Sequence, residues 1–136
     1  MESLQGRPAF LLLLLVLSQC KADESDFFFP KRAHLTMQNT MSDIVDVHCK
    51  SGEDDLGVLT LQPSQTFSFT FRPSAIAVTL FCCSFKWNNM LKYFDIYDES
   101  RDRKQCAECL WEVHASGPCM FNYRTHQYDI CYPWNP

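Results

Sequence analysis

The strongest candidate chemistry in the sequence is a Cys-x-x-Cys motif formed by Cys106 and Cys109. Two cysteines at this spacing can bind zinc as thiolates or act as a redox pair, and Cys119 and Cys131 follow downstream. Disulfide bonds are the alternative, and they are favoured if the chain enters an oxidising compartment. The destination of the chain therefore decides what these cysteines do.

An N-terminal apolar run indicates that the chain is exported. Arg7 precedes apolar residues 9–17, a run shorter than the roughly 20 residues that a membrane-spanning helix needs. Small residues follow, so we predict a signal peptide over residues 1–22, cleaved after Ala22 or, alternatively, after Cys20. An uncleaved anchor is the other possibility. No later segment is apolar for long enough to cross a membrane, so we expect a secreted, extracellular product with no membrane insertion after cleavage.

The expected mature chain, residues 23–136, is one acidic domain. Removing 22 of the 136 residues leaves 114, and the loss of Glu2, Arg7 and Lys21 changes the net charge from −4 to −5. We do not expect nucleic acid as a partner, because nucleic acid favours a basic surface. Eight cysteines become seven when Cys20 is removed, so one should be left unpaired or form an intermolecular bond.

The other candidates for chemistry are weaker. The acidic run Glu53, Asp54 and Asp55 offers oxygen ligands for calcium, but the 12-residue calcium-loop pattern is missing. The four histidines have no nucleophile motif around them: His34, His48, His114 and His126. We therefore predict no enzymatic activity, no cofactor and no metal site.

Alternation of apolar and polar residues predicts short strands. In residues 80–87, Phe81, Cys83 and Phe85 fall on one face. Cys49, Cys109 and Cys119 also fall on predicted inward faces. The apolar residues change from even to odd positions at Phe81, which predicts a bulge or a passage covered on both faces. The predicted strands cover residues 34–39, 43–49, 56–61, 66–72, 76–87, 91–97, 109–113, 119–123 and 130–132. This pattern favours an all-β fold, a small antiparallel β-sandwich of about eight strands stabilised by disulfides.

An ordered series of short motifs carries a family resemblance. The series contains His48-Cys49-Lys50-Ser51, Asp54-Asp55-Leu56-Gly57, Phe67-x-Phe69-x-Phe71-Arg72, Thr79-Leu80-Phe81-x-Cys83-x-Phe85-x-Trp87, Phe94-Asp95-Ile96-Tyr97, Cys109-x-Trp111 and Gly117-x-Cys119. In this order it resembles the plant self-incompatibility S1 family, also called S-protein homologues, over roughly residues 35–134.

The resemblance implies a secreted plant β-sandwich with two internal disulfides. The family's four cysteines match Cys49, Cys83, Cys109 and Cys119, and three ways of pairing them stay open. A further Cys106–Cys131 bridge is predicted, which would leave Cys82 unpaired. Because the founding members are stigma-secreted ligands recognised at the pollen surface, the resemblance also implies a monomeric extracellular signalling ligand for a cell-surface receptor. The alternative is a secreted defence protein, either an inhibitor or an antimicrobial protein.

Two charged loops are candidates for contact with that receptor, because recognition residues on a rigid sandwich tend to lie in its loops. The first is the turn over residues 50–55, with Glu53, Asp54 and Asp55. The second loop contributes Asp98, Glu99, Arg101, Asp102, Arg103 and Lys104. The alternative for the second loop is that its charges only keep a sheet edge soluble.

Overall fold

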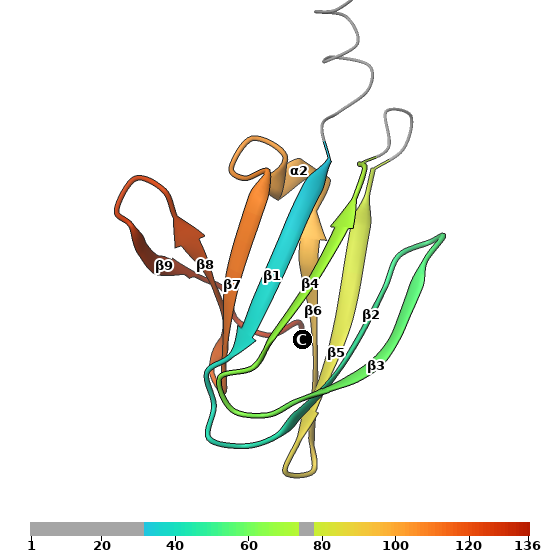
Figure 1. Cartoon of the computed structure of the whole chain (residues 1–136), viewed down its shortest axis with the longest axis vertical. Coiled ribbons are helices and arrows are strands. Elements are labelled where there is room, and N and C mark those ends of the chain that lie inside the picture. The colour runs from blue at the N-terminus through green and yellow to red at the C-terminus, as the bar shows by residue number, and fades with distance from the viewer. Residues whose placement is uncertain (1–31, 74–77) are drawn as a thin grey trace, which may run out of the picture. The chain divides into compact units, whose positions relative to one another are not determined.

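The computed structural model describes residues 32–73 and 78–136, and within them it contains nine strands and one short helix (Figure 1). The predicted signal peptide and residues 23–31 lie outside the described residues. The elements are β1 (Ala33–Asn39), β2 (Val45–Lys50), β3 (Asp55–Leu61), β4 (Thr66–Phe71), β5 (Leu80–Trp87), β6 (Met90–Asp98), α2 (Glu99–Asp102), β7 (Glu108–His114), β8 (Gly117–Asn122) and β9 (Gln127–Cys131).

The strands form two sheets, which confirms the predicted all-β sandwich. One sheet has the order β4-β1-β7-β8-β9 and the other has the order β3-β2-β5-β6. The prediction of a purely antiparallel fold was wrong in one place, because β1 and β7 pair in parallel. These strands are not joined by a hairpin. The chain crosses to the other sheet between them, and this connection allows the parallel direction.

The predicted inward faces form the core between the two sheets, except in β8, where Met120 faces the core and the prediction that Cys119 points inward was wrong. β1 buries Leu35 and Met37, β5 buries Phe81, Cys83 and Phe85, and the rest of the core has the same alternation. Burial of one large apolar side chain contributes roughly 1.5–3 kcal/mol. The bulge predicted at Phe81 is confirmed, because the register of β5 against β6 shifts between Phe81 and Cys82.

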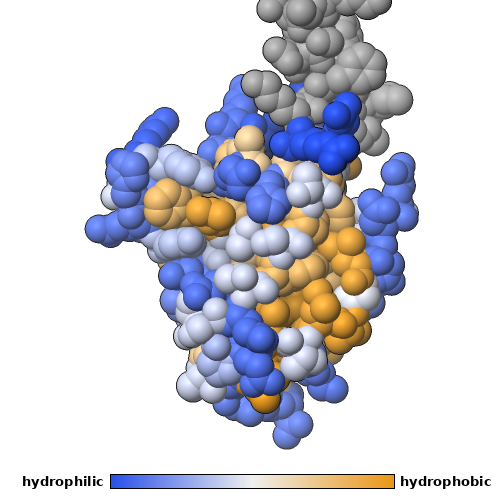
Figure 2. Space-filling model, in the orientation of Figure 1, coloured by the Kyte–Doolittle hydropathy of each residue, from blue (hydrophilic) through white to orange (hydrophobic). Residues whose placement is uncertain are grey.

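The edge strands β3 and β4 leave apolar surface exposed. Figure 2 shows this surface beside the two strands. Leu59 of β3 is 38% exposed, whereas Phe67 and Phe69 of β4 are half-buried and pack against the core. The alternation in β4 therefore predicted which side chains face inward but not that the edge of the sandwich stays partly open.

Three disulfides are formed by the cysteines of the described residues. They are Cys49–Cys83, Cys106–Cys109 and Cys119–Cys131, and Cys82 is free, as predicted. The predicted Cys106–Cys131 bridge is wrong. The expectation that Cys109 and Cys119 pair within the set of four core cysteines is also wrong, whereas the bond between Cys49 and Cys83 lies within that set.

The faces of the strands explain these two corrections. Cys119 of β8 lies opposite Glu112, which points away from the core, whereas Cys109 shares the core face with Trp111. Because neighbouring residues of a strand point to opposite faces, Cys109 and Cys119 lie on different sides of the sheet. The residue directly opposite Cys119 is Cys131 of β9, with a Cα–Cα distance of 4.0 Å.

Candidate functional site

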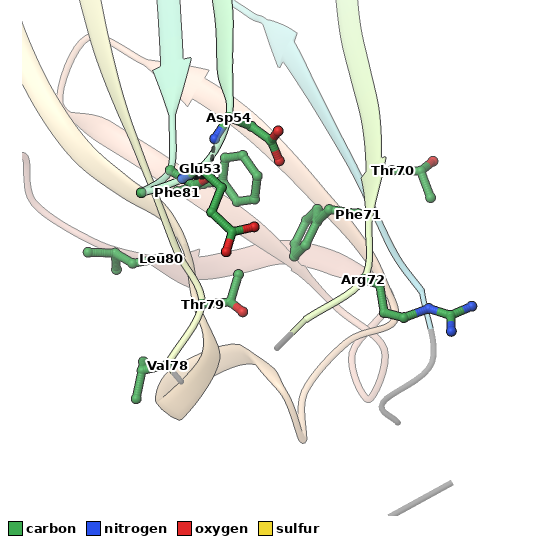
Figure 3. A pocket seen from close by; sticks show the side chains of 11 residues that line it. Glu53, Asp54, Thr70, Phe71, Arg72, Val78, Thr79, Leu80 and Phe81 are labelled. Atoms are coloured by element: carbon green, nitrogen blue, oxygen red, sulfur yellow. Dashed lines mark hydrogen bonds between the residues drawn. The ribbon is translucent and has the colours of Figure 1, made fainter. Parts of the chain in front are cut away.

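A pocket of about 330 Å³ lies where the β2–β3 turn meets the end of β4 and the start of β5 (Figure 3). Figure 3 shows Glu53 reaching toward Thr79, with the Phe71 and Phe81 rings behind it and Arg72 pointing outward. The lining residues are Ser51, Gly52, Glu53, Asp54, Thr70, Phe71, Arg72, Val78, Thr79, Leu80 and Phe81. The volume falls at the small end of the range for ligand sites.

The β2–β3 turn is ordered by its own hydrogen bonds. The Ser51 hydroxyl accepts from the backbone N–H groups of Glu53 at 3.3 Å and Asp54 at 3.0 Å, and the Ser51 N–H donates to the Asp54 carbonyl at 2.7 Å. Serine side chains often close turns in this way. The side chains of Glu53 and Asp54 are thus presented to solvent on a fixed backbone.

Asp55 has a different role from its two neighbours. Its carboxylate accepts the Gly57 N–H at 2.9 Å and lies 2.6 Å from His48 Nε2. These contacts, the Gly57 N–H first, lower the pKa of Asp55 below its ordinary value. Asp55 therefore fixes the start of β3 and does not line the pocket.

Helix α2 is fastened to the strand that lines the pocket. The Thr79 N–H donates to Glu99 Oε2, and the Glu99 N–H donates to the Thr79 carbonyl, each at 3.0 Å. Asp98 caps the helix, since its carboxylate accepts the Ser100 hydroxyl at 2.6 Å and the Ser100 N–H at 3.0 Å. These bonds, the hydroxyl first, lower the pKa of Asp98. The second predicted loop is therefore bonded to the residue before β5, and residues 51–54 of the first loop line the pocket beside that residue.

A buried ion pair lies inside the second predicted loop. Asp102 is 0% exposed, and its two carboxylate oxygens lie 2.7 Å from Arg101 Nε and 2.6 Å from Arg101 Nη2. The Asp98 N–H donates to the same carboxylate at 3.0 Å. The guanidinium also lies 5.0–5.3 Å from the ring centroids of three aromatic residues, Phe94, Trp111 and Tyr132.

This burial corrects part of the predicted contact surface. Glu99 and Asp102 are buried and bonded to other parts of the domain, so they cannot contact a partner directly. Arg103 and Lys104 are exposed, and Arg103 lies 3.6 Å from Glu99. The pocket also contains residues that the sequence did not single out as site residues, such as Arg72 and Val78, because only the folded chain brings them beside the turn.

The buried acidic groups affect a neighbouring tyrosine. Tyr97 is 1% exposed, and burial, followed by the charges of Asp102 and Glu99, raises its pKa to about 12. An unfolded tyrosine titrates near pH 10, so the folded state holds this proton more tightly. We expect this contribution to stability to be complete below pH 10 and lost between pH 10 and 12. In Tyr97→Phe, the free energy of unfolding measured in urea should fall less between pH 10 and 12 than in the unchanged protein. The same pH dependence in the variant and the unchanged protein would contradict this.

The Cys-x-x-Cys motif forms a disulfide at the start of β7. Cys106 and Cys109 are bonded to each other, so neither offers a thiolate to zinc while the bond is intact. Among the residues that the structure describes, no group of three or more His, Cys, Asp or Glu side chains is arranged to hold a metal ion. The described part of the chain also has no helix long and apolar enough to cross a membrane.

The protein is a small disulfide-bonded β-sandwich, and its candidate site lies where a turn meets the ends of two strands. Residues 34–134 match the family model of plant self-incompatibility protein S1, and the chain belongs to this family. S-protein homolog 3 of Arabidopsis thaliana is 40% identical over 133 residues, covering 93% of this chain and 87% of that protein. S-protein homolog 4 of the same plant is 38% identical over 133 residues. This alignment covers 93% of this chain and 88% of that protein.

A solved structure supports the assignment of the fold. It is described as the structure of SPH (self-incompatibility protein homologue) proteins, a widespread family of small, highly stable, secreted proteins from plants. The two structures have a TM-score of 0.57 at 19% sequence identity, over 78% of this chain and 96% of that chain. As a member of this family, the chain is a secreted plant protein.

Proposed function

We propose that the protein is an extracellular signalling ligand for a cell-surface receptor. The receptor would contact the end of the sandwich that holds the pocket beside Glu53, which we call the pocket end. The observation that carries this proposal is the pair of exposed carboxylates, Glu53 and Asp54, on a turn with an ordered backbone. Membership of the self-incompatibility family supports a role in recognition. We infer a binding role, because both carboxylates are exposed on the turn and are available for contact with another protein.

The scaffold favours recognition by holding the turn in place before binding. The Cys49–Cys83 disulfide joins the end of β2 to β5 immediately before the turn begins. Helix α2 holds the start of β5 on the other side of the pocket through Glu99 and Thr79. A surface that is already ordered loses less conformational entropy on binding.

The chemistry of this end indicates what the receptor should present. Glu53 and Asp54 carry negative charge, while Val78 is 71% exposed and Leu80 is 41% exposed on the adjacent segment. A complementary surface would place basic side chains against the turn and an apolar patch against the start of β5. Opposite charges would also raise the association rate at low salt.

The double variant Glu53→Gln/Asp54→Asn tests the proposed contact. It removes two charges without disturbing the Ser51 hydrogen bonds, which involve only backbone atoms of Glu53 and Asp54. We expect binding of the labelled secreted chain to its target cells to weaken about tenfold, mainly through slower association. Apparent Kd values from binding isotherms at low and high salt would measure the effect.

A matched control removes two charges from the other sheet, Glu112→Gln and Asp129→Asn, and should bind as the unchanged protein does. Equal Kd values for both double variants would contradict the assignment of the contact to the pocket end. Exchange of the whole α2 segment is a poorer test, because it would also remove the buried Asp102.

A further inference from the structure

A second pocket, of about 400 Å³, lies between the loop after α2 and the β8–β9 hairpin. Lys104 and Gln105 line it from the loop. Phe121 and Asn122 of β8 line it from the hairpin, together with Tyr123 and Arg124 of the following turn. The volume is within the range of small-ligand sites. The pocket shares no lining residue with the pocket at the β2–β3 turn.

The charge of this pocket is opposite to that of the whole chain. The chain has a net charge of −4, yet two of the described lining residues are cations, Lys104 and Arg124, and none is acidic. Neither cation forms an ion pair with any residue that the structure describes. The nearby carboxylates have other partners, Glu108 with His34 at 2.9 Å and Asp129 with Thr125 at 2.7 Å. The two cations are therefore available to an anionic ligand.

Aromatic rings form one wall of the pocket. Tyr123 is 46% exposed, and its hydroxyl donates to the Glu108 carbonyl at 2.6 Å, which fixes the direction of the ring. Phe121 packs edge-on against Tyr123 at 4.9 Å between centroids and against Tyr128 at 5.2 Å. An exposed ring held in one orientation offers its electron-rich face to the C–H groups of a sugar ring.

Two amides complete the chemistry of the pocket. Gln105 and Asn122 can each donate and accept hydrogen bonds, as neighbouring hydroxyl groups of a sugar require. Asn122 is held in place because its side-chain oxygen accepts the Arg124 N–H at 2.9 Å, and this leaves its NH₂ group to donate. An acidic peptide would also use the two cations and the amides, but polyglutamate has no flat face of C–H groups to lie on the exposed ring.

We propose that this pocket binds an acidic oligosaccharide. The carboxylates of the sugar would lie against Lys104 and Arg124, and one sugar ring would lie on Tyr123. Uronic acid oligomers have this combination of carboxylate, hydroxyl groups and apolar C–H face. The proposal does not depend on the proposed receptor contact, because the two sites share no residue.

Isothermal titration of the secreted chain with trigalacturonic acid tests this proposal, with its neutral methyl ester and hexaglutamate as comparison probes. We expect saturable binding of the acid at low salt, loss of binding with the ester, and weaker binding with the peptide. The amide NMR signals of Asn122 and Arg124 should shift during the titration. High salt should weaken the binding, because charge contributes to it.

Variants locate the binding. Lys104→Gln/Arg124→Gln should weaken it at least tenfold, and Tyr123→Ala should weaken it about fivefold. The control Lys50→Gln/Lys86→Gln removes two exposed cations from the other sheet and should bind as the unchanged protein does. The proposal is overturned if the acid does not bind saturably, if both charge variants weaken it equally, or if hexaglutamate binds as tightly as the sugar.

Discussion

Replacement of Asp102 by asparagine is expected to lower the free energy of unfolding by about 3 kcal/mol, because it leaves Arg101, whose side chain is only 19% exposed, without its counter-charge. Both carboxylate oxygens of Asp102 bond to Arg101, and the carboxylate also accepts the Asp98 N–H. Three aromatic rings surround the guanidinium, so water cannot easily replace the lost partner. Urea unfolding followed by tryptophan fluorescence would measure the change.

Two further variants separate this effect from a general effect of charge. Glu53→Gln also removes one carboxylate but at an exposed position, so it should change stability by less than about 0.5 kcal/mol. Arg101→Met/Asp102→Leu removes the pair together and should recover much of the loss, as apolar replacements of buried pairs often do. A loss below about 1 kcal/mol for Asp102→Asn would contradict the structural role given to this carboxylate.

Removal of the Cys49–Cys83 disulfide is expected to have the other large effect, a loss of about 4 kcal/mol. The bond spans 34 residues of sequence, and the entropy of an unfolded chain rises with the length of the loop that is released. The Cys106–Cys109 bond spans 3 residues, so its removal should cost only about 2 kcal/mol in the same model.

The variants Cys49→Ala/Cys83→Ala and Cys106→Ala/Cys109→Ala form a matched comparison, since each removes one disulfide and two sulfur atoms. Thermal and urea unfolding under non-reducing conditions would rank them. Equal losses, or a larger loss for the Cys106–Cys109 pair, would show that strain or packing outweighs chain entropy at these positions. In either variant the free Cys82 should be blocked before measurement, to prevent exchange between thiols and disulfides.

Local alternation predicted most of the strands because each strand carries its own signal. Leu35 and Met37 of β1 and Phe81 and Phe85 of β5 are buried where the period of two places them. The phase change at Phe81 was enough to predict the bulge that the register of β5 and β6 contains. These features depend on neighbouring residues alone, so a single sequence is sufficient to predict them.

Features that depend on distant residues were not predictable in the same way. The face of Cys119 depends on the register of β8 against β7, and its partner depends on the register of β9. The charges of Glu99 and Asp102 suggested solvent exposure, but Glu99 bonds to Thr79 and Asp102 bonds to Arg101 inside the fold. The pocket beside Glu53 exists only because three separate segments meet there.

Binding of the labelled secreted chain to living cells of the plant that produces it, pollen included, tests the central claim most directly. The account predicts saturable binding to at least one cell type, competition by excess unlabelled chain, and loss of binding after the cells are treated with protease. Binding that does not saturate, or that survives complete digestion of surface proteins on every cell type tested, would contradict a ligand recognised by a cell-surface receptor.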